Sequence, residues 1–473
     1  MSDIQTVPLL IDGRWRTSDV RSTTTAPFDG VPVAAVCDTT PGLLHAALSA
    51  ARRAAPQVAA TPARERAGIL RRAAEAVRRH TEVIARSMAE ETGKPLRDGR
   101  TEVMRSAETL ELSAEEAVRI EGAHVPMDAS AIGAGKLGVV LRYPVGVVAA
   151  ITPFNAPVNL TAHKLGPAWA AGNAVVLKPS PQAALSVHRF VEALLEGGVP
   201  LPWLQMVQGD EAAAAMVKSD QVDFVSFTGS SRVGAIVRAG SGLKRVALEL
   251  GGNGFTIVAD DAPAEAAATC ARNGTRLAGQ SCISVQNVLV HRSRHADFVA
   301  TMAAHMQHLR VGDPLQEQTD VGPVISAASA ERIQQMVDAA VAAGARLVCG
   351  GRHQSALYEP TLLAEVPAGC AVVEDEVFGP VVSVLPYDDI DEAMARVNAS
   401  PFGLQAGIYT HSMPLALRAA AALRVGALIV NGSSTWRSDQ APYGGVKASG
   451  IGREGPRFAI RDMTEERFIV FNT

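Results

Sequence analysis

A cysteine and a glutamate in the sequence could together form and then break a covalent bond. Cys282 ends the polar stretch GQSC (279–282), and Glu249 lies between two leucines in LELGGN (248–253). A thiolate is a strong nucleophile, and a carboxylate among apolar neighbours can have its pKa raised toward neutrality, so that it can activate a water molecule. The alternatives are a buried cysteine that only fills space and a carboxylate held in an ion pair.

An asparagine in the segment TPFNAP (152–157) could support such a reaction. Asn155 follows the apolar run VGVVAAI (145–151), which is typical of a buried strand. Its amide could donate a hydrogen bond to a developing oxyanion, and one such donor is worth about 2.7 to 4 kcal/mol of barrier. The alternative is that Asn155 only orders a proline-rich turn.

Two further segments could hold a phosphate or a ribose. The apolar run that ends at Phe227 leads directly into TGSSRVG (228–234), a turn bounded by glycines that opens a helix, where free N–H groups suit a pyrophosphate. Lys178 follows the strand-like NAVVL (173–177), at the sheet edge where doubly wound folds bind ligands. An ordinary strand-to-helix connection and a solvated surface lysine are the alternatives.

Alternating apolar and helical patterns must position these residues. Short strands are predicted at 173–177, 204–207 and 224–227, with helices at 182–197 and 210–218 between them. This alternation indicates βαβ units and a parallel sheet. A second alternating section between about 249 and 430 contains strand-like runs at 255–258, 288–290, 346–350, 381–387 and 427–430. Two α/β domains in sequence are the simplest account.

Two other segments have patterns of their own. The apolar spacing from Pro62 to Thr92 predicts one long amphipathic helix, ended by Gly93 and Pro95. Residues 122–144 are predicted to form a hairpin that leaves the main body.

The composition excludes several classes of partner. The chain has 473 residues, 44 basic and 48 acidic side chains and a net charge of −4, which favours neither nucleic acid nor an anionic membrane as a partner. The chain has no apolar run of membrane-spanning length and no signal-peptide pattern at its start, so we expect a cytoplasmic protein. The five cysteines lack C-x-x-C pairing, and because no metal-ligand spacing occurs, we predict no metal.

Taken together and in this order, the motifs resemble those of the aldehyde dehydrogenase superfamily along nearly the whole chain. They are PFN (153–155), VVLKPS (175–180), FTGSSRVG (227–234), LELGGN (248–253), GQSC (279–282), EDEVFGPV (374–381) and PYGGVKASGIGRE (442–454). The resemblance implies an α/β fold class with two doubly wound domains and a β-hairpin oligomerisation arm. It implies a Rossmann-like cofactor domain (1–121 and 145–248), a catalytic domain (249–440) and an arm (122–144 and 456–473), in a homodimer or homotetramer.

The resemblance also implies a role for each motif residue. Cys282 would add to an aldehyde, Asn155 and the backbone N–H of Cys282 would hold the oxyanion, and the thiohemiacetal would give a hydride to the nicotinamide of NAD or NADP. Glu249 would then direct water onto the resulting thioester and release the acid. The implied cofactor-binding residues are Lys178 at the adenosine ribose, Ser180, the turn residues Gly229, Ser230 and Gly234 at the pyrophosphate, and Glu376 and Phe378 at the nicotinamide ribose and ring edge.

Departures from the family pattern bear on specificity. Pro181 stands where many NAD-preferring members have an acid, so both NAD and NADP remain open. Ser281 stands where relatives that oxidise anionic semialdehydes often have arginine. This favours a small aliphatic aldehyde or a hydroxy-aldehyde of the lactaldehyde or glycolaldehyde kind, followed by semialdehydes and then aromatic aldehydes. Arg105 and Arg437 lie where relatives line the substrate entrance; the alternatives are a salt bridge and a loop-ordering contact.

The presence of Glu249 favours release of a free acid, because family members that pass the acyl group to coenzyme A usually lack this carboxylate. Two rival functions stay open. One is an acyl-transfer enzyme, either coenzyme A-acylating or an esterase. The other is a catalytically retired descendant of the fold, against which the intact Cys282, Glu249 and Asn155 argue.

Overall fold

Apolar runs from the first half of the chain form most of an eight-stranded sheet in the computed structural model, which describes residues 4–472. The strand order is β22 (Gly450–Ile451), β12 (Arg245–Glu249), β11 (Phe224–Thr228), β8 (Val147–Ile151), β9 (Ala174–Lys178), β10 (Leu204–Met206), β2 (Leu9–Ile11) and β3 (Arg14–Arg16). From β12 to β10 the neighbouring strands are parallel, and the remaining pairs are antiparallel. Because parallel strands end at one edge, Lys178, Thr228 and Glu249 lie along the same rim.

The helices of this first body share one core with its sheet. They are α1 (Pro41–Ala60), α2 (Ala63–Arg79), α3 (Thr81–Thr92), α4 (Leu96–Ala117), α5 (Pro157–Ala171), α6 (Ala184–Glu196), α7 (Asp210–Lys218), α8 (Ser231–Gly240) and α15 (Pro456–Asp462). The prediction of one helix from Pro62 to Thr92 is wrong, because the chain breaks at His80 (φ −94°, ψ 12°). The N–H of His80 closes the last turn of α2 on Ala76 and Val77, and α3 starts afresh. None of the helices described between residues 4 and 472 is long and apolar enough to cross a membrane.

The second body contains a seven-stranded sheet with a core on each face. Its order is β15 (Arg346–Cys349), β18 (Thr361–Ala364), β19 (Val381–Tyr387), β14 (Asn287–His291), β13 (Phe255–Val258), β20 (Gln405–Tyr409) and β21 (Ala427–Val430). Only β15 runs antiparallel to its neighbour. Alternation along each strand sends Ile257 and Leu289 into one core and Val258, Val288 and Val290 into the other.

Helices cover both of these cores. The first contains residues of α11 (Ala327–Ala342), α12 (Ala371–Glu374), α13 (Ile390–Ala399) and α14 (Met413–Ala422), and the second contains residues of α9 (Ala266–Thr275) and α10 (Arg292–Gln307). The doubly wound architecture expected from the sequence is therefore confirmed. The sequence did not predict β18 and β20.

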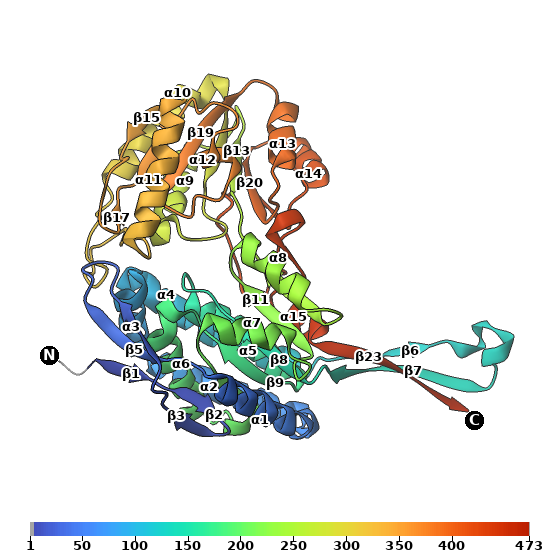
Figure 1. Cartoon of the computed structure of the whole chain (residues 1–473). Helices are drawn as coiled ribbons and strands as arrows, with labels where there is room; N and C mark the ends of the chain where they lie inside the picture. Colours follow the sequence, from blue (N-terminus) through green and yellow to red (C-terminus); the bar gives the residue numbers. More distant parts are fainter. Residues whose placement is uncertain (1–3, 473) are drawn as a thin grey trace.

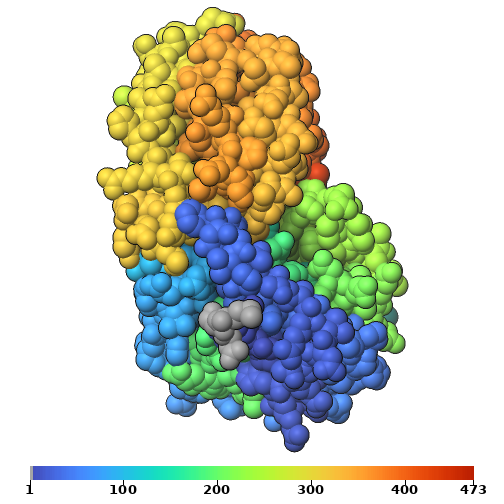
Figure 2. All heavy atoms as spheres, turned by 60° about the vertical axis from the view of Figure 1, so that its left-hand side comes forward, coloured from blue at the N-terminus to red at the C-terminus, as the bar shows by residue number. Residues whose placement is uncertain are grey.

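Smaller elements complete the two bodies. A three-stranded sheet joins β1 (Gln5–Val7), β5 (Pro32–Cys37) and β4 (Arg21–Thr25), and β16 (His353–Gln354) pairs with β17 (Leu357–Tyr358). The short 3-10 turns are η1 (Met127–Ala129), η2 (Ala131–Gly133), η3 (Pro181–Ala183), η4 (Leu201–Trp203), η5 (Arg276–Gly279) and η6 (Lys447–Ser449). Figure 2 shows the second body, in yellow and orange, stacked on the first, with early residues of the chain in blue reaching up to it.

The predicted hairpin projects from the first body as an arm (Figure 1). β6 (Ala123–Val125) and β23 (Thr464–Asn472) both pair antiparallel with β7 (Lys136–Pro144), so β7 lies in the middle. The assignment of the whole of 456–473 to the arm is wrong, because Pro456–Asp462 forms α15 against α4 and α5. Ile460 and Met463 are buried in the first core, which fixes this helix to the body.

Candidate active site

The strand ends of the first body and loops of the second body enclose a cavity of about 790 Å³. Its walls include Lys178, Ser230 and Glu249 from one side and Cys282 and Phe378 from the other. A volume of this order suits a small-molecule site. Most of the residues predicted from the sequence therefore come together in one place.

Cys282 lies in the cavity wall and follows a loop with a strained backbone. After α9, the residues Leu277 (φ 55°), Ala278 (φ 51°) and Gly279 (φ 69°) all adopt left-handed backbone conformations, which are costly for residues other than glycine. A Cβ atom on Gly279 would lie 1.9 Å from the carbonyl oxygen of Gly379. Only glycine therefore fits at position 279. Burial raises the pKa of the Cys282 thiol to about 12, and its hydrogen bond with Tyr443 acts in the opposite direction.

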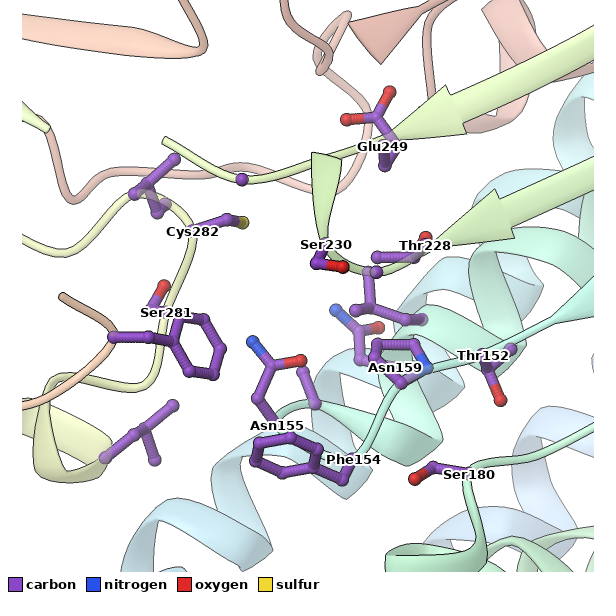
Figure 3. A pocket seen from close by; sticks show the side chains of 18 of the residues that line it. Thr152, Phe154, Asn155, Asn159, Ser180, Thr228, Ser230, Glu249, Ser281 and Cys282 are labelled. Carbon is purple, nitrogen blue, oxygen red and sulfur yellow. The ribbon is translucent and has the colours of Figure 1, made fainter. Parts of the chain in front are cut away.

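Asn155 lies beside the nucleophile loop. It follows β8, and its Nδ2 donates a hydrogen bond to the carbonyl oxygen of Gln280 at 3.0 Å, two residues before Cys282. Figure 3 shows Asn155 and Cys282 pointing into the same cavity from different walls. An amide donor and the thiol thus face one cavity, as oxyanion stabilisation requires.

Glu249 is a buried carboxylate in the cavity wall. It ends β12 and is 3% exposed, and among residues 4–472 neither of its oxygens has a hydrogen-bond partner. Burial and then the Glu454 carboxylate raise the pKa of Glu249 well above its ordinary value, while Arg437 and Lys164 act against this rise. A buried carboxylate usually has a partner, so Glu249 is a candidate for proton transfer.

A tyrosine that the sequence analysis did not single out touches the nucleophile. Oη of Tyr443 lies 2.9 Å from Sγ of Cys282. The guanidinium of Arg437 covers the Tyr443 ring, with its central carbon 3.9 Å from the ring centroid. The signal for it in the sequence is the tyrosine of PYGG (442–445), which is part of the motif at 442–454.

The two arginines predicted for the substrate entrance both line the cavity, and both are engaged by carboxylates. Nε and Nη2 of Arg105 donate to Asp439 at 3.0 and 2.7 Å. Nη2 of Arg437 donates to Glu454 at 2.9 Å, whereas its buried Nε has no partner among the residues that the structure describes. Arg105 therefore forms a salt bridge and Arg437 a contact that orders its loop, and both residues still line the cavity.

At the opposite end of the cavity Lys178 ends β9. Its Nζ lies 2.7 Å from Oδ1 of Asp210, the first residue of α7. Ser180 lines the same wall and donates to Gln182. A carboxylate therefore reaches the predicted adenosine site from another element, although Pro181 supplies none.

The turn that is predicted to hold the pyrophosphate also contributes to the cavity wall. Gly229 and Ser230 line the cavity, and the hydroxyl of Ser230 caps α8 by accepting from the N–H of Val233 at 3.4 Å. Gly234 is not part of the cavity wall. A Cβ atom there would lie 2.4 Å from the side chain of Leu250, so its missing side chain serves helix packing.

Glu376 and Phe378 complete the wall near Cys282. Oε1 of Glu376 accepts from the N–H of Gly252 at 3.1 Å, and burial raises the pKa of Glu376 to about 7. Phe378 has a φ of 50° and packs edge-on against Phe154, with ring centroids 6.0 Å apart. A lysine, a helix N-terminus and a carboxylate thus follow one another along the cavity, which fits an extended dinucleotide. No group of three or more His, Cys, Asp and Glu in residues 4–472 is arranged to hold a metal ion.

Comparisons with known proteins agree with this arrangement. A family model described as the aldehyde dehydrogenase family matches residues 15–469. The 3-sulfolactaldehyde dehydrogenase of Priestia aryabhattai is 46% identical over 367 residues, covering 77% of each chain. The lactaldehyde dehydrogenase of Methanococcus aeolicus is 35% identical, over 77% of this chain and 78% of that one. The crystal structure of NADP-dependent glyceraldehyde-3-phosphate dehydrogenase from Bacillus halodurans, complexed with NADP, has a TM-score of 0.96 at 34% identity and covers 99% of each chain.

Proposed function

The chain belongs to the aldehyde dehydrogenase family, and we propose that it oxidises a small 2-hydroxyaldehyde of the lactaldehyde or glycolaldehyde kind to its acid. It is an NAD(P)-dependent enzyme. The observation that carries the mechanism is the presence of a thiol, an amide donor and a buried carboxylate in one cavity: Cys282, Asn155 and Glu249.

The first chemical step belongs to Cys282 and Asn155. Sγ of the Cys282 thiolate forms a bond to the aldehyde carbon, and the electron pair of the carbonyl moves to oxygen. Nδ2 of Asn155 donates to that oxyanion, with the backbone N–H of Cys282 as a second donor. Lys178, Ser230 and Glu376 would hold the dinucleotide, which would supply the hydride acceptor. Loss of a hydride from this carbon converts the thiohemiacetal on Cys282 into a thioester.

The second step belongs to Glu249. Its carboxylate takes a proton from a water molecule whose oxygen attacks the acyl carbon, and the bond to Sγ of Cys282 breaks as the acid leaves. Burial raises the pKa of this carboxylate, which makes it a stronger base than an exposed glutamate. A base at this position favours hydrolysis over transfer of the acyl group to coenzyme A.

Two observations support a 2-hydroxyaldehyde as substrate. Ser281 places a small polar side chain in the cavity wall next to the nucleophile. The relatives compared above have the names lactaldehyde dehydrogenase and 3-sulfolactaldehyde dehydrogenase, and both names denote 2-hydroxyaldehydes. A hydroxyl next to the aldehyde is the feature that these substrates share.

A second candidate is a hydroxyaldehyde with an anionic tail. The observation that favours it is the presence of two arginines, Arg105 and Arg437, in the wall of the cavity. A guanidinium suits the oxygens of a sulfonate or carboxylate. The 46% identical relative is named for a sulfonated aldehyde.

A steady-state screen with both NAD and NADP tests the proposal. Its aldehydes are lactaldehyde, glycolaldehyde, 3-sulfolactaldehyde, succinic semialdehyde, propanal and benzaldehyde, without coenzyme A. The proposal predicts a higher kcat/KM for lactaldehyde than for propanal, which lacks only the hydroxyl. A kcat/KM for propanal equal to that for lactaldehyde would contradict it, and a further gain with 3-sulfolactaldehyde would favour the second candidate.

The arm supports a homo-oligomer as the working form. Its exposed side chains include Ile132, Leu137, Leu141, Phe468 and Phe471, which is unusual for a surface that meets only water. Both outer strands, β6 and β23, also have an edge that no strand of residues 4–472 covers. Light scattering should give a dimer or tetramer, and a monomer at micromolar concentration would contradict this. A cytoplasmic location stays a prediction from the sequence.

A further inference from the structure

Tyr443 contacts the nucleophile Cys282 but has no part in the mechanism proposed above. We propose that Tyr443 is a further catalytic residue, whose hydroxyl donates a hydrogen bond to the Cys282 thiolate both when the sulfur attacks and when it leaves. The contact on which this rests joins Oη of Tyr443 and Sγ of Cys282 at 2.9 Å.

The direction of this hydrogen bond follows from chemistry. A thiol could donate to the phenol oxygen, but a thiolate has no proton and can only accept. Burial raises the pKa of Tyr443 well above its ordinary value, so the phenol keeps its proton and stays a donor. Among residues 4–472 no second hydrogen-bond partner of this sulfur is found, since the amide of Asn155 donates to Gln280.

The surroundings of Tyr443 hold its hydroxyl in place. The side chain is buried, with the residue 6% exposed, and the backbone forms an antiparallel bridge with Glu454. Arg437 lies over the ring at 3.9 Å and is itself held by the Glu454 carboxylate at 2.9 Å. Backbone and ring face are thus both fixed by the same pair of residues, so the donor needs no reorganisation when charge forms on the sulfur.

The donor matters because burial opposes thiolate formation. Glu376 and Glu249 add to that opposition, and Arg437 and Tyr443 are the groups that act against it. The nucleophilicity of a thiolate falls less steeply than its pKa, so each unit of pKa removed from a mostly protonated thiol raises its reaction rate by about threefold.

Tyr443 keeps its proton throughout the cycle. In the attack, the electron pair of Sγ becomes the bond to carbon, and the hydrogen bond weakens as the charge moves to oxygen. In hydrolysis, the pair of the carbon–sulfur bond returns to Sγ and the same hydroxyl donates to it again. No proton moves to or from the tyrosine, so Tyr443 stabilises charge and does not act as a base.

The test is the pH dependence of Cys282 alkylation by iodoacetamide in the full-length apoenzyme. Peptide-resolved mass spectrometry separates Cys282 from Cys349 and Cys370, which are also partly accessible. Tyr443→Phe keeps the ring beneath Arg437 and removes only the hydroxyl. It should lower the Cys282 alkylation rate at pH 8 by at least about threefold. Tyr358→Phe is the matched control, because that buried hydroxyl has no partner among the described residues.

Superimposable profiles for wild type and Tyr443→Phe would overturn the proposal, as would an equal loss in Tyr358→Phe. Incorporation of 3-fluorotyrosine at position 443 keeps ring and hydroxyl and makes a stronger donor, so a folding defect cannot explain its effect. The Cys282 alkylation rate at pH 8 should then rise, and an unchanged or lower rate would also overturn the proposal. The assay needs no aldehyde, so its result is independent of the proposed substrate.

Discussion

Nζ of Lys178 lies 2.7 Å from Oδ1 of Asp210, so the lysine at the predicted adenosine site is already paired with a carboxylate. Asp38 is a second carboxylate nearby, and the charges of Asp210 and Lys178 both act on its pKa. The 2′-phosphate of NADP would bring further negative charge to this corner, whereas the 2′-hydroxyl of NAD could donate to Asp210.

We therefore expect wild type to prefer NAD, and Asp210→Asn to improve the binding of NADP relative to NAD by about fivefold, because two unit charges 4 Å apart repel by about 1 kcal/mol even in bulk water. Calorimetric Kd values for both dinucleotides measure this. Glu211→Gln removes a neighbouring exposed charge outside the cavity wall and should change nothing. A wild-type preference for NADP would contradict the expectation.

Glu249→Gln should separate the two chemical steps. Glutamine cannot take a proton from water, so the thioester should form and then persist. Stopped-flow mixing with aldehyde and cofactor should show a burst of about one NADH per site, followed by turnover reduced about 10²- to 10⁴-fold. Equal steady rates for wild type and Glu249→Gln would remove this residue from deacylation.

The pH dependence of turnover should follow the same carboxylate. Because the pKa of Glu249 is raised, the group is protonated and inactive as a base below a midpoint well above 4.5. Where hydrolysis limits the rate, kcat should fall as the pH falls through that midpoint, while the amplitude of the NADH burst persists. A kcat that stays constant down to pH 4.5 would show that the raised pKa does not control deacylation.

Gly279→Ala tests the close approach that shapes the nucleophile loop. The added methyl would meet the carbonyl of Gly379, so the loop must move and Cys282 with it. We expect a loss of stability of about 1 to 3 kcal/mol and a large loss of activity. Gly369→Ala is the control, since its φ of 80° is similar but nothing lies within 4 Å of the added carbon. Thermal unfolding of the two variants separates the effect of the clash from that of backbone strain. Equal losses of stability in both variants would show that the close approach to Gly379 does not matter.

Much of the fold could be predicted from local pattern. The runs FTIV and ALIV form β13 and β21 with the predicted bounds. A short apolar run bounded by turns is typical of a buried strand. Lys178 is predicted directly after a strand, whereas the strand β12 that ends at Glu249 is not predicted. Parallel pairing of β12, β11, β8 and β9 brings both residues to one rim.

The parts that were missed depend on distant contacts. The break at His80 leaves the apolar spacing of α2 and α3 nearly continuous, so the periodicity does not reveal it. The partner of Arg105 is Asp439, and that of Cys282 is Tyr443, both far away in the sequence. No spacing rule connects such residues, because the folding of both bodies brings them together.

The mechanism requires that Cys282 carries the acyl group. Glu249→Gln mixed with lactaldehyde and NAD, then quenched in acid, should carry a lactoyl group on the Cys282 peptide in an amount equal to the NADH burst, and Cys282→Ala should give neither. Steady NADH formation by Cys282→Ala, or a full burst with the label on another residue, would contradict it.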